Sequence, residues 1–234
     1  LEGASERLGA AEYYGDQEFV GVVSTKENYG WGYGGREDFG EPGDGYKATL
    51  AVLDCGLKFN ILRRFAALGI QSKVFPHTAS AEEILASGAH GVLLSPGPGD
   101  PAKLAGVVVT AKNLLGQKPL FGICLGNQIL CQAVGGSTYK LKFGHRGSNH
   151  PVKDLEDGSV TITSQNHGYA VDADSLDESV AVVTQLNVND GTVEGIRVKG
   201  ADASSIQFHP EAAPGPWDSR IYFVQFVDRM IQAK

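Results

Sequence analysis

The sequence predicts an α/β fold with a mainly parallel central sheet and helices on both of its faces, followed by antiparallel strands in the C-terminal half. Between residues 48 and 134, short apolar runs alternate with stretches whose apolar residues recur at helical spacing. Strands that alternate with helices lie parallel, and their ligands bind beyond the carboxyl ends. After Gly136 the apolar period changes to two, which is typical of antiparallel strands separated by turns.

The first half contains four predicted strands and four predicted helices. The strands cover 48–53, 72–75, 91–94 and 120–123, and the helices cover 57–68, 80–86, 102–115 and 125–134. Gly69 ends the first helix, and Gly135 with Gly136 ends the last. Ser80, followed by Glu83 three residues later, is the pattern of a capping box at the start of the second helix.

The second half contains five predicted strands and a closing helix. The strands cover 137–143, 159–164, 181–185, 193–198 and 204–208, and the helix covers 218–232, with Ile221, Val224, Val227 and Ile231 on one face. Residues 1–47 differ from the rest of the chain. A short helix is expected at 4–13, and the glycine-rich stretch 29–45 is predicted to lack regular structure and to act as a linker.

Composition excludes some partners. The net charge of −7, with acidic and basic residues interspersed, argues against a nucleic-acid partner. No apolar run is long enough for a membrane span, and no signal peptide is apparent. Cys55, Cys124 and Cys131 are an odd number without metal-ligand spacing, so we expect free thiols in the cytoplasm. The six histidines show no metal-ligand spacing either, and no metal site is expected.

One stretch joins a predicted strand to a predicted helix through Gly122-Ile-Cys-Leu-Gly126. This is the spacing of a nucleophile elbow, with cysteine in place of serine. Such a sharp turn requires small flanking residues, and it presents Cys124 at the carboxyl end of the sheet. The partial positive charge of a helix N-terminus favours a thiolate there. The alternative is a packing cysteine beside a glycine turn, and this pattern alone does not separate the two.

The strand at 91–94 continues into Ser-Pro-Gly-Pro-Gly-Asp-Pro at 95–101. Alternating proline and glycine form rigid surface turns in many proteins. The same stiffness would hold the N–H of Gly97 in a fixed direction beside Cys124. We therefore predict that the N–H groups of Gly97 and Leu125 form an oxyanion hole, with a plain turn as the alternative.

A nucleophilic cysteine needs a base, and the base needs a group that orients it. His209-Pro210-Glu211 follows the last predicted strand and precedes the closing helix. Pro210 favours extended backbone at His209, and in extended backbone residues two apart face the same side. His209 and Glu211 are therefore predicted to be the base and its orienting carboxylate, with an ordinary loop at a strand end as the alternative.

Two further polar segments adjoin predicted strands. The loop 164–169 offers backbone and amide groups to a small polar substrate. The segment 142–151 is dense in hydrogen-bond donors, and its simplest interpretation is an exposed, solvated hairpin.

Together these segments resemble the class I (triad) glutamine amidotransferases. The resemblance rests on Gly-Ile-Cys-Leu-Gly-Asn-Gln at 122–128 and on His-Pro-Glu at 209–211, and it covers residues 48–234. The segments most similar to the glutamine-hydrolysing small subunit of carbamoyl-phosphate synthase are 53–63, 142–151, 165–169 and 209–218. Residues 1–47 then correspond to a linker or remnant of that family's N-terminal domain, and 48–234 to the amidotransferase domain.

Position by position, the resemblance implies a catalytic triad of Cys124, His209 and Glu211. It also implies that L-glutamine is bound by Gly97, Gly99, Leu125, Gln128, Asn166, Gly168 and Tyr169. No cofactor is expected in this chain, because the resemblance assigns ATP and Mg²⁺ to a partner, the large synthetase subunit. The chain departs from the family pattern at Asn127, where relatives often carry histidine, and at Pro96, where they often carry asparagine.

The function implied by the resemblance is the glutaminase half of carbamoyl-phosphate synthase. Cys124 would attack the amide of glutamine, a thioester would form, and ammonia would pass to the large subunit. Two alternatives stay open. One is the amidotransferase subunit of another synthase, of the anthranilate or aminodeoxychorismate type. The other is a cysteine hydrolase that acts on γ-glutamyl compounds.

Overall fold

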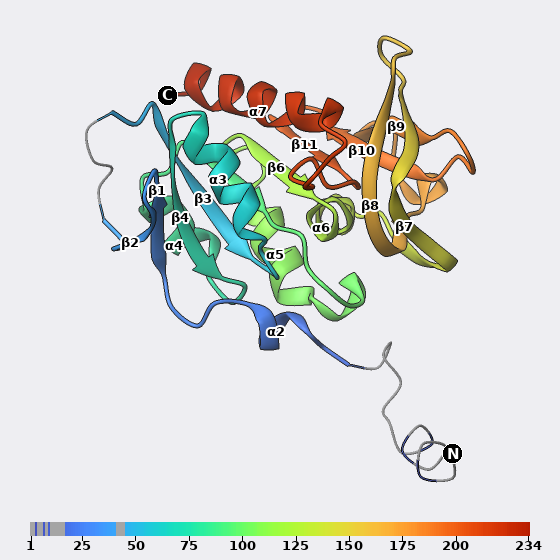
Figure 1. Cartoon of the computed structure of the whole chain (residues 1–234), viewed down its shortest axis with the longest axis horizontal. Helices are drawn as coiled ribbons and strands as arrows, with labels where there is room; N and C mark the ends of the chain where they lie inside the picture. Colours follow the sequence, from blue (N-terminus) through green and yellow to red (C-terminus); the bar gives the residue numbers. More distant parts are fainter. Residues whose placement is uncertain (1–2, 4–6, 8, 10–16, 41–44) are drawn as a thin grey trace.

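A single eleven-stranded sheet organises the chain in the computed structural model, which describes residues 3, 7 and 9, 17–40 and 45–234 (Figure 1). The strands are β1 (Tyr29–Gly32), β2 (Gly35–Glu37), β3 (Ala48–Asp54), β4 (Ile70–Pro76), β5 (Gly91–Leu94), β6 (Leu120–Ile123), β7 (Thr138–Asp154), β8 (Val160–Val171), β9 (Ala181–Asn187), β10 (Val193–Val198) and β11 (Ala203–Ile206). Their spatial order is β2-β1-β4-β3-β5-β6-β11-β10-β9-β7-β8.

The five neighbouring strands β4-β3-β5-β6-β11 are parallel, and the pairs on either side of them are antiparallel. The predicted fold class is therefore confirmed. Six α-helices and three short 3-10 helices complete the described part of the chain. They are α2 (Val20–Val23), α3 (Phe59–Ala67), α4 (Ala81–Ala86), α5 (Ala105–Leu114), α6 (Leu125–Ala133), α7 (Ile221–Gln232), η2 (Pro101–Lys103), η3 (Ala173–Ser175) and η4 (Asp218–Arg220).

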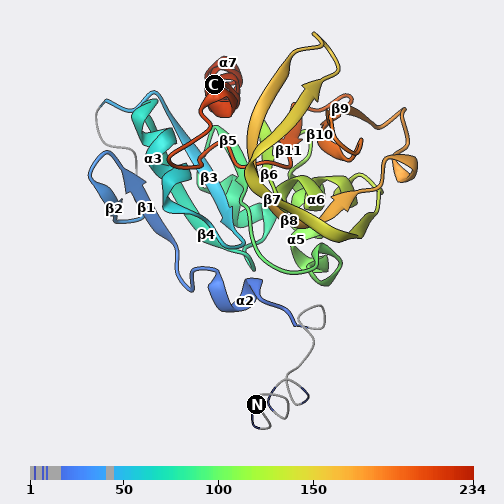
Figure 2. The same cartoon turned by 45° about the vertical axis from the view of Figure 1, so that its right-hand side comes forward.

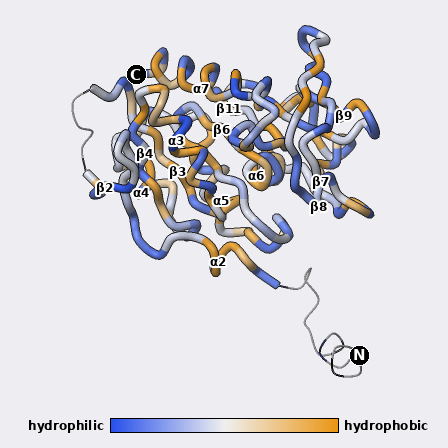
Figure 3. The backbone as a smooth tube through the Cα atoms, in the orientation of Figure 1, coloured by the Kyte–Doolittle hydropathy of each residue, from blue (hydrophilic) through white to orange (hydrophobic). Residues whose placement is uncertain are grey.

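Helices cover both faces of the parallel strands (Figure 2). Alternate residues of β3 belong to two different apolar clusters, because successive side chains of a strand point to opposite faces. Leu50 and Val52 pack with α3 and α7, whereas Ala51 and Leu53 pack with α4, α5 and α6. The hydropathy colouring shows apolar chain along the central strands and also on the small helix α2 (Figure 3). No helix in the described ranges is long and apolar enough to cross a membrane.

The glycine-rich stretch 29–45 contains two strands, so the prediction that it lacks regular structure is wrong. β1 pairs with β4, and β2 pairs with β1. Tyr29 and Trp31 are buried, and the ring of Trp31 stacks on Phe59 with centroids 5.1 Å apart. Packing of these aromatic side chains outweighs the low strand propensity of the glycines between them. Residues 41–44 and most of the helix expected at 4–13 lie outside the described residues.

The segments 142–151 and 164–169 are parts of the long strands β7 and β8, so the prediction of a loop at 164–169 is wrong, whereas 142–151 belongs to a largely exposed hairpin as expected. The two strands form a hairpin with register shifts, and the end of β7 also pairs with β9 (Figure 1). His145, Gln165 and His167 are buried in this hairpin rather than solvated. Their side chains hydrogen-bond to one another, which is what allows polar strands to be buried.

Two predicted helices begin with a separate 3-10 turn. The Asp100 side chain caps η2, and α5 starts only at Ala105. Likewise η4 precedes α7. The buried residues of α7 are Phe223, Phe226, Val227 and Met230, whereas Ile221, Val224 and Ile231 of the predicted apolar face are 49%, 39% and 39% exposed. The aromatic side chains decide which face of α7 is buried, because they pack against residues of β6 and α3.

The domain boundary at residue 48 remains a prediction.

Candidate active site

A cavity of about 450 Å³ lies where the parallel strands end. Because β3, β5, β6 and β11 are parallel, the segments that follow them meet at one edge of the sheet. These segments contribute Gly56 and Lys58, Pro96 to Gly99, Cys124, and His209. Gln128 of α6 and residues of the β7–β8 hairpin complete the wall of the cavity. The hairpin residues are Lys140, Arg146, Asn166, His167, Gly168 and Tyr169.

Cys124 sits at a strained turn between β6 and α6. Its φ and ψ are 55° and −101°, and among the described residues it is the one non-glycine residue with positive φ. A Cβ atom at Gly122 would collide with the backbone oxygen of Gly126, and one at Gly126 with that of Leu94. The elbow predicted from the glycine spacing is therefore present, and Cys124 lines the cavity.

Cys124, His209 and Glu211 lie together, and His209 is hydrogen-bonded to Glu211. Nδ1 of His209 lies 2.8 Å from Oε1 of Glu211. Cys124 and His209 line the same cavity, and Cys124 is close enough to act on the pKa of His209. The backbone N–H of His209 donates to the oxygen of Ser164 at 2.8 Å, which ties the base to β8. The structure thus brings the three predicted triad residues together.

The charges of the triad stabilise one another. Burial lowers the pKa of His209, but the negative charge of Cys124 and the hydrogen bonds to Cys124 and Glu211 outweigh burial and raise that pKa to about 10. Burial also acts to raise the pKa of Glu211. Its hydrogen bond to His209 and the charges of His209 and Lys58 hold that pKa below its ordinary value. The arrangement therefore favours a charged imidazolium on His209 beside the carboxylate of Glu211.

Lys58 and Asn60 were not predicted as site residues. Nζ of Lys58 lies 3.2 Å from Oε1 of Glu211 and 3.1 Å from Nδ1 of His209. Nδ2 of Asn60 donates to the backbone oxygen of Glu211. Both residues come from the start of α3, about 150 positions before the triad residues they contact. The segment 53–63 carried part of the family resemblance, but nothing local in it assigns these contacts.

The predicted oxyanion hole involves Gly97 and Leu125. Gly97 lines the cavity, and a Cβ atom there would collide with the backbone oxygen of Cys55, so only glycine fits. Leu125 is the first residue of α6 and lies behind the cavity wall. An N–H in the first turn of a helix has no intrahelical acceptor and is free for a ligand. The arrangement is compatible with the predicted role, which stays a prediction.

The other predicted glutamine-binding residues lie around the same cavity. Gly99, Gln128, Asn166, Gly168 and Tyr169 all line it. Gly99 has a φ of 91°, which a residue with a Cβ atom rarely adopts. Nε2 of Gln128 donates to the backbone oxygen of Tyr169 at 2.9 Å and so joins α6 to β8. Of the two departures from the family pattern, Pro96 lines the cavity, whereas Asn127 is buried behind it.

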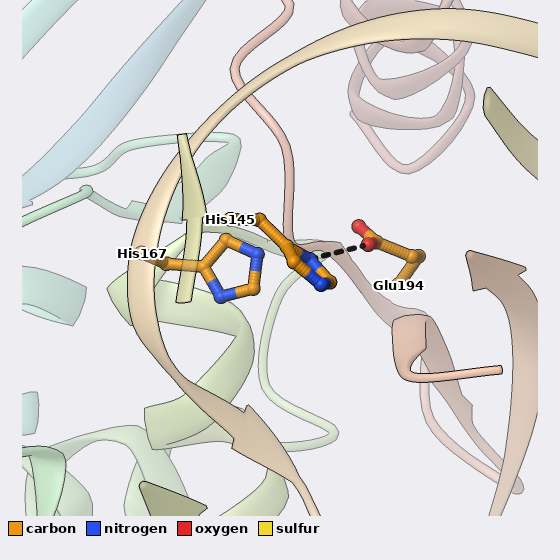
Figure 4. Close-up of side chains that lie close together, drawn as sticks. All are labelled: His145, His167 and Glu194. Atoms are coloured by element: carbon orange, nitrogen blue, oxygen red, sulfur yellow. Dashed lines mark ion pairs between the residues drawn. The ribbon is translucent and has the colours of Figure 1, made fainter. Parts of the chain in front are cut away.

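His145, His167 and Glu194 lie close together, and of these three His167 lines the cavity (Figure 4). One potential ligand atom from each residue lies within 4.8 Å of the others, a grouping that sequence spacing did not indicate. Each ring nitrogen, however, already has a protein partner. His145 contacts Gln165 at 2.9 Å and Asp190 at 2.8 Å, and His167 contacts Gln165 and the oxygen of Tyr169, both at 2.8 Å.

The two histidines of this cluster differ in charge. The ion pair with Glu194, at 3.6 Å, outweighs burial and, with Asp190, raises the pKa of His145 to about 9. Burial lowers the pKa of His167 to about 4. A charged His145 therefore balances the buried carboxylate of Glu194, while a neutral His167 faces the cavity. The cluster supports the cavity wall through the hydrogen bonds of its two rings, whereas Oε2 of Glu194 is buried without a hydrogen-bond partner among the described residues.

Comparison with known proteins supports the geometry. The family model described as glutamine amidotransferase class-I matches residues 51–229. A protein of Methanopyrus kandleri named carbamoyl phosphate synthase small chain is 48% identical over 222 residues, which are 95% of this chain and 58% of that protein. Its namesake in Staphylococcus haemolyticus is 50% identical over 190 residues, which are 81% of this chain and 52% of that protein. The chain thus spans little more than half the length of these relatives.

The fold also occurs in a solved structure. The crystal structure of a putative GMP synthase subunit from Thermoplasma acidophilum aligns with a TM-score of 0.66. The alignment covers 80% of this chain and 98% of that chain, at 21% sequence identity. At this identity the similarity supports the arrangement of helices and strands alone.

Proposed function

Because the chain belongs to the class I glutamine amidotransferase family, we propose that it hydrolyses L-glutamine to glutamate and ammonia. The observation that carries the proposal is the grouping of Cys124 with the hydrogen-bonded pair His209 and Glu211, with Cys124 at an elbow that opens into a cavity. A cysteine nucleophile, a base and an orienting carboxylate are the three groups that amide cleavage through a thioester needs.

The reaction follows from these positions. The sulfur of Cys124 attacks the side-chain carbonyl carbon of glutamine, and the N–H groups of Gly97 and Leu125 stabilise the negative charge that develops on its oxygen. His209 gives its proton to the leaving nitrogen, so ammonia departs and a γ-glutamyl thioester remains. His209 then takes a proton from water, which attacks the thioester. Glutamate and the free thiol are released.

We further propose that the ammonia passes to a large synthetase subunit that uses ATP and Mg²⁺ to form carbamoyl phosphate. The proposal is supported by the relatives at 45–51% identity, which are named carbamoyl phosphate synthase small chain. These names favour it over the alternatives of another synthase or a γ-glutamyl hydrolase. The three free cysteines suit a cytoplasmic location.

The test separates the two nitrogen sources. With the large subunit reconstituted, Cys124→Ser should eliminate glutamine-driven carbamoyl phosphate synthesis, because a hydroxyl stays protonated where a thiol ionises. Synthesis from ammonium salts should persist, since free ammonia bypasses amide cleavage. Cys131→Ala, a change on the same helix away from the cavity, is the matched control and should keep both activities. If Cys124→Ser lost the ammonium-driven reaction as completely as the glutamine-driven reaction, the nitrogen-donor role would be contradicted.

A further inference from the structure

Four polar side chains behind the cavity join the helix that follows the nucleophile to the strand that precedes the base. They are Ser205, Asn127, Gln207 and Gln128, and we call them the amide relay. Their exposed fractions are 2%, 0%, 0% and 3%. Buried amide groups need hydrogen-bond partners. A buried amide left without a partner costs more free energy than a hydrogen bond contributes net to stability. The direction of each bond in the relay therefore has consequences for its neighbours.

The relay has a defined polarity. Oγ of Ser205 donates to Oδ1 of Asn127 at 2.8 Å. Nδ2 of Asn127 then donates to Oε1 of Gln207 at 3.0 Å. The same Oε1 accepts a second hydrogen bond, from Nε2 of Gln128 at 3.1 Å.

The last member, Gln128, is held by two acceptors. Its Nε2 donates to Oε1 of Gln207 and also to the backbone oxygen of Tyr169 at 2.9 Å. A backbone carbonyl only accepts, so the NH₂ end of Gln128 must face Tyr169. Both N–H bonds of this amide are thus used inside the protein. The oxygen Oε1 is the end of Gln128 left for the cavity, which this residue lines.

An amide oxygen that faces a ligand accepts hydrogen bonds and attracts a cationic donor. Resting on the function proposed above, we propose that Ser205, Asn127 and Gln207 are positioning residues that hold the oxygen of Gln128 toward the α-ammonium group of the substrate. The relay then gives Asn127, a departure from the family pattern, a defined role. Its amide supplies the donor that keeps Gln207 from rotating.

A reversed Gln128 would be disfavoured at both ends. Its oxygen would face the oxygens of Gln207 and Tyr169, and its NH₂ group would face the ammonium of the ligand. Gln207 uses only its oxygen in the relay, because its Nε2 has no hydrogen-bond partner within the described residues. Gln207→Met therefore removes one acceptor from the relay while keeping a side chain of similar length and leaving the cavity wall intact.

The test compares two ligands that differ in one group. L-Glutamine and 4-carbamoylbutanoate, the same amide without the amino group, are titrated calorimetrically into the Cys124→Ser chain, which cannot turn them over. Gln207→Met in this background should weaken glutamine binding about tenfold or more and leave 4-carbamoylbutanoate binding unchanged, because only the ammonium contact is lost. Ser205→Ala is a milder change. It should also lower the affinity for glutamine relative to that for 4-carbamoylbutanoate, but by less than Gln207→Met does.

The matched control is Gln132→Met, one turn further along α6, where Nε2 donates to Thr138 at 3.1 Å outside the relay. It should leave the ratio of affinities unchanged. Thermal unfolding checks that each variant is folded. If Gln207→Met does not fold, the ratio of affinities measured for Ser205→Ala tests the relay. If the relay variants weaken the binding of both ligands equally, or leave the ratio of the two affinities unchanged, the proposed role of the relay is wrong, while the proposed function is unaffected. A Cys124→Ser chain that binds neither ligand would contradict the proposed function, and the substrate contact of Gln128 with it.

Discussion

The three cysteines of the chain are all buried, yet their surroundings differ. Burial raises the pKa of the Cys55 thiol, and the charge of Asp54 raises it further. Burial likewise raises the pKa of Cys131 to about 12. Cys124 instead lies at the N-terminus of α6 and lines the cavity together with His209. The position in the fold, more than the residue type, decides which of the three thiols reacts.

We expect a glutamine-analogue electrophile to label Cys124 and to spare Cys55 and Cys131. Both of those thiols stay protonated at neutral pH and lie outside the cavity. Peptide mapping by mass spectrometry after labelling checks the prediction, with Cys124→Ala as the control that should take up no label. Label found on Cys131, together with loss of glutaminase activity, would show that the nucleophile is misassigned.

His209 and Glu211 should contribute unequally to catalysis. His209 moves a proton in both half-reactions, whereas Glu211 orients the ring and stabilises its charge. His209→Asn should therefore abolish glutamine hydrolysis. Glu211→Gln should leave a measurable remainder, because an amide oxygen still accepts from Nδ1. Steady-state ammonia release measures both variants. A larger loss in Glu211→Gln than in His209→Asn would reverse these roles.

Among the elements, the β7–β8 hairpin contributes several polar residues to the cavity wall, including Lys140, Arg146 and Asn166. His145 fastens this hairpin to β10 and the loop before it, since its ring lies 2.8 Å from Asp190 and 3.6 Å from Glu194. The same region holds His167 through Gln165. The hairpin therefore acts as a rigid wall, and a protonated histidine is part of what holds it.

This attachment predicts a pH-dependent stability. The pKa of His145 is raised from its ordinary 6.5 to about 9, first by its interaction with Glu194. A raised pKa in the folded state stabilises the fold fully below pH 6.5, and the contribution is lost as the pH rises through about 9. We expect the free-energy difference between the parent and His145→Gln to shrink over that range.

Urea unfolding at a series of pH values measures this difference. Thr163→Val is the matched control, because Thr163 belongs to the same network through Gln165 but carries no titratable group. Its cost should stay constant over the same range. A His145→Gln difference that is flat between pH 6 and about 9, or that grows with pH, would contradict a charged His145.

At the scale of the whole molecule, one continuous sheet joins segments from both ends of the described chain. β1 and β2 extend the sheet beyond β4, and the β7–β8 hairpin forms the other end. The active-site cavity lies between them, at the carboxyl ends of the parallel strands. The strand β1, next to the edge strand β2, is held by aromatic packing, because Trp31 stacks on Phe59 of α3, the helix that follows Lys58.

Trp31→Ala should destabilise the fold by about 3 kcal/mol, the usual cost of truncating a buried aromatic residue. Tyr33→Ala is the control, because Tyr33 is largely exposed in the turn after β1. It should cost less than about 1 kcal/mol. Urea unfolding of both variants checks the prediction. A Trp31→Ala cost as small as that of Tyr33→Ala would mean that β1 is not part of the cooperative fold.

Much of the fold and of the site was determined by local patterns in the sequence. Alternating strands and helices predicted the parallel sheet, because apolar periodicity reports which faces are buried. The spacing Gly122-x-Cys124-x-Gly126 predicted the elbow, since its two glycines are needed by contacts within the turn and with the adjoining strand. His209 and Glu211 were predictable because extended backbone places residues two apart on the same side.

Only the tertiary structure decided which distant residues complete the site. Lys58 and Asn60 reach the triad from the start of α3, and Gln207, which follows β11, meets Asn127 of α6. It also decided that a glycine-rich stretch and two polar segments become strands, because their side chains pack or bond to partners far along the chain. Local sequence patterns show whether apolar residues recur at the period of a helix or of a strand. The burial of a polar residue and its hydrogen-bond partners depend instead on residues that come close only in the folded chain.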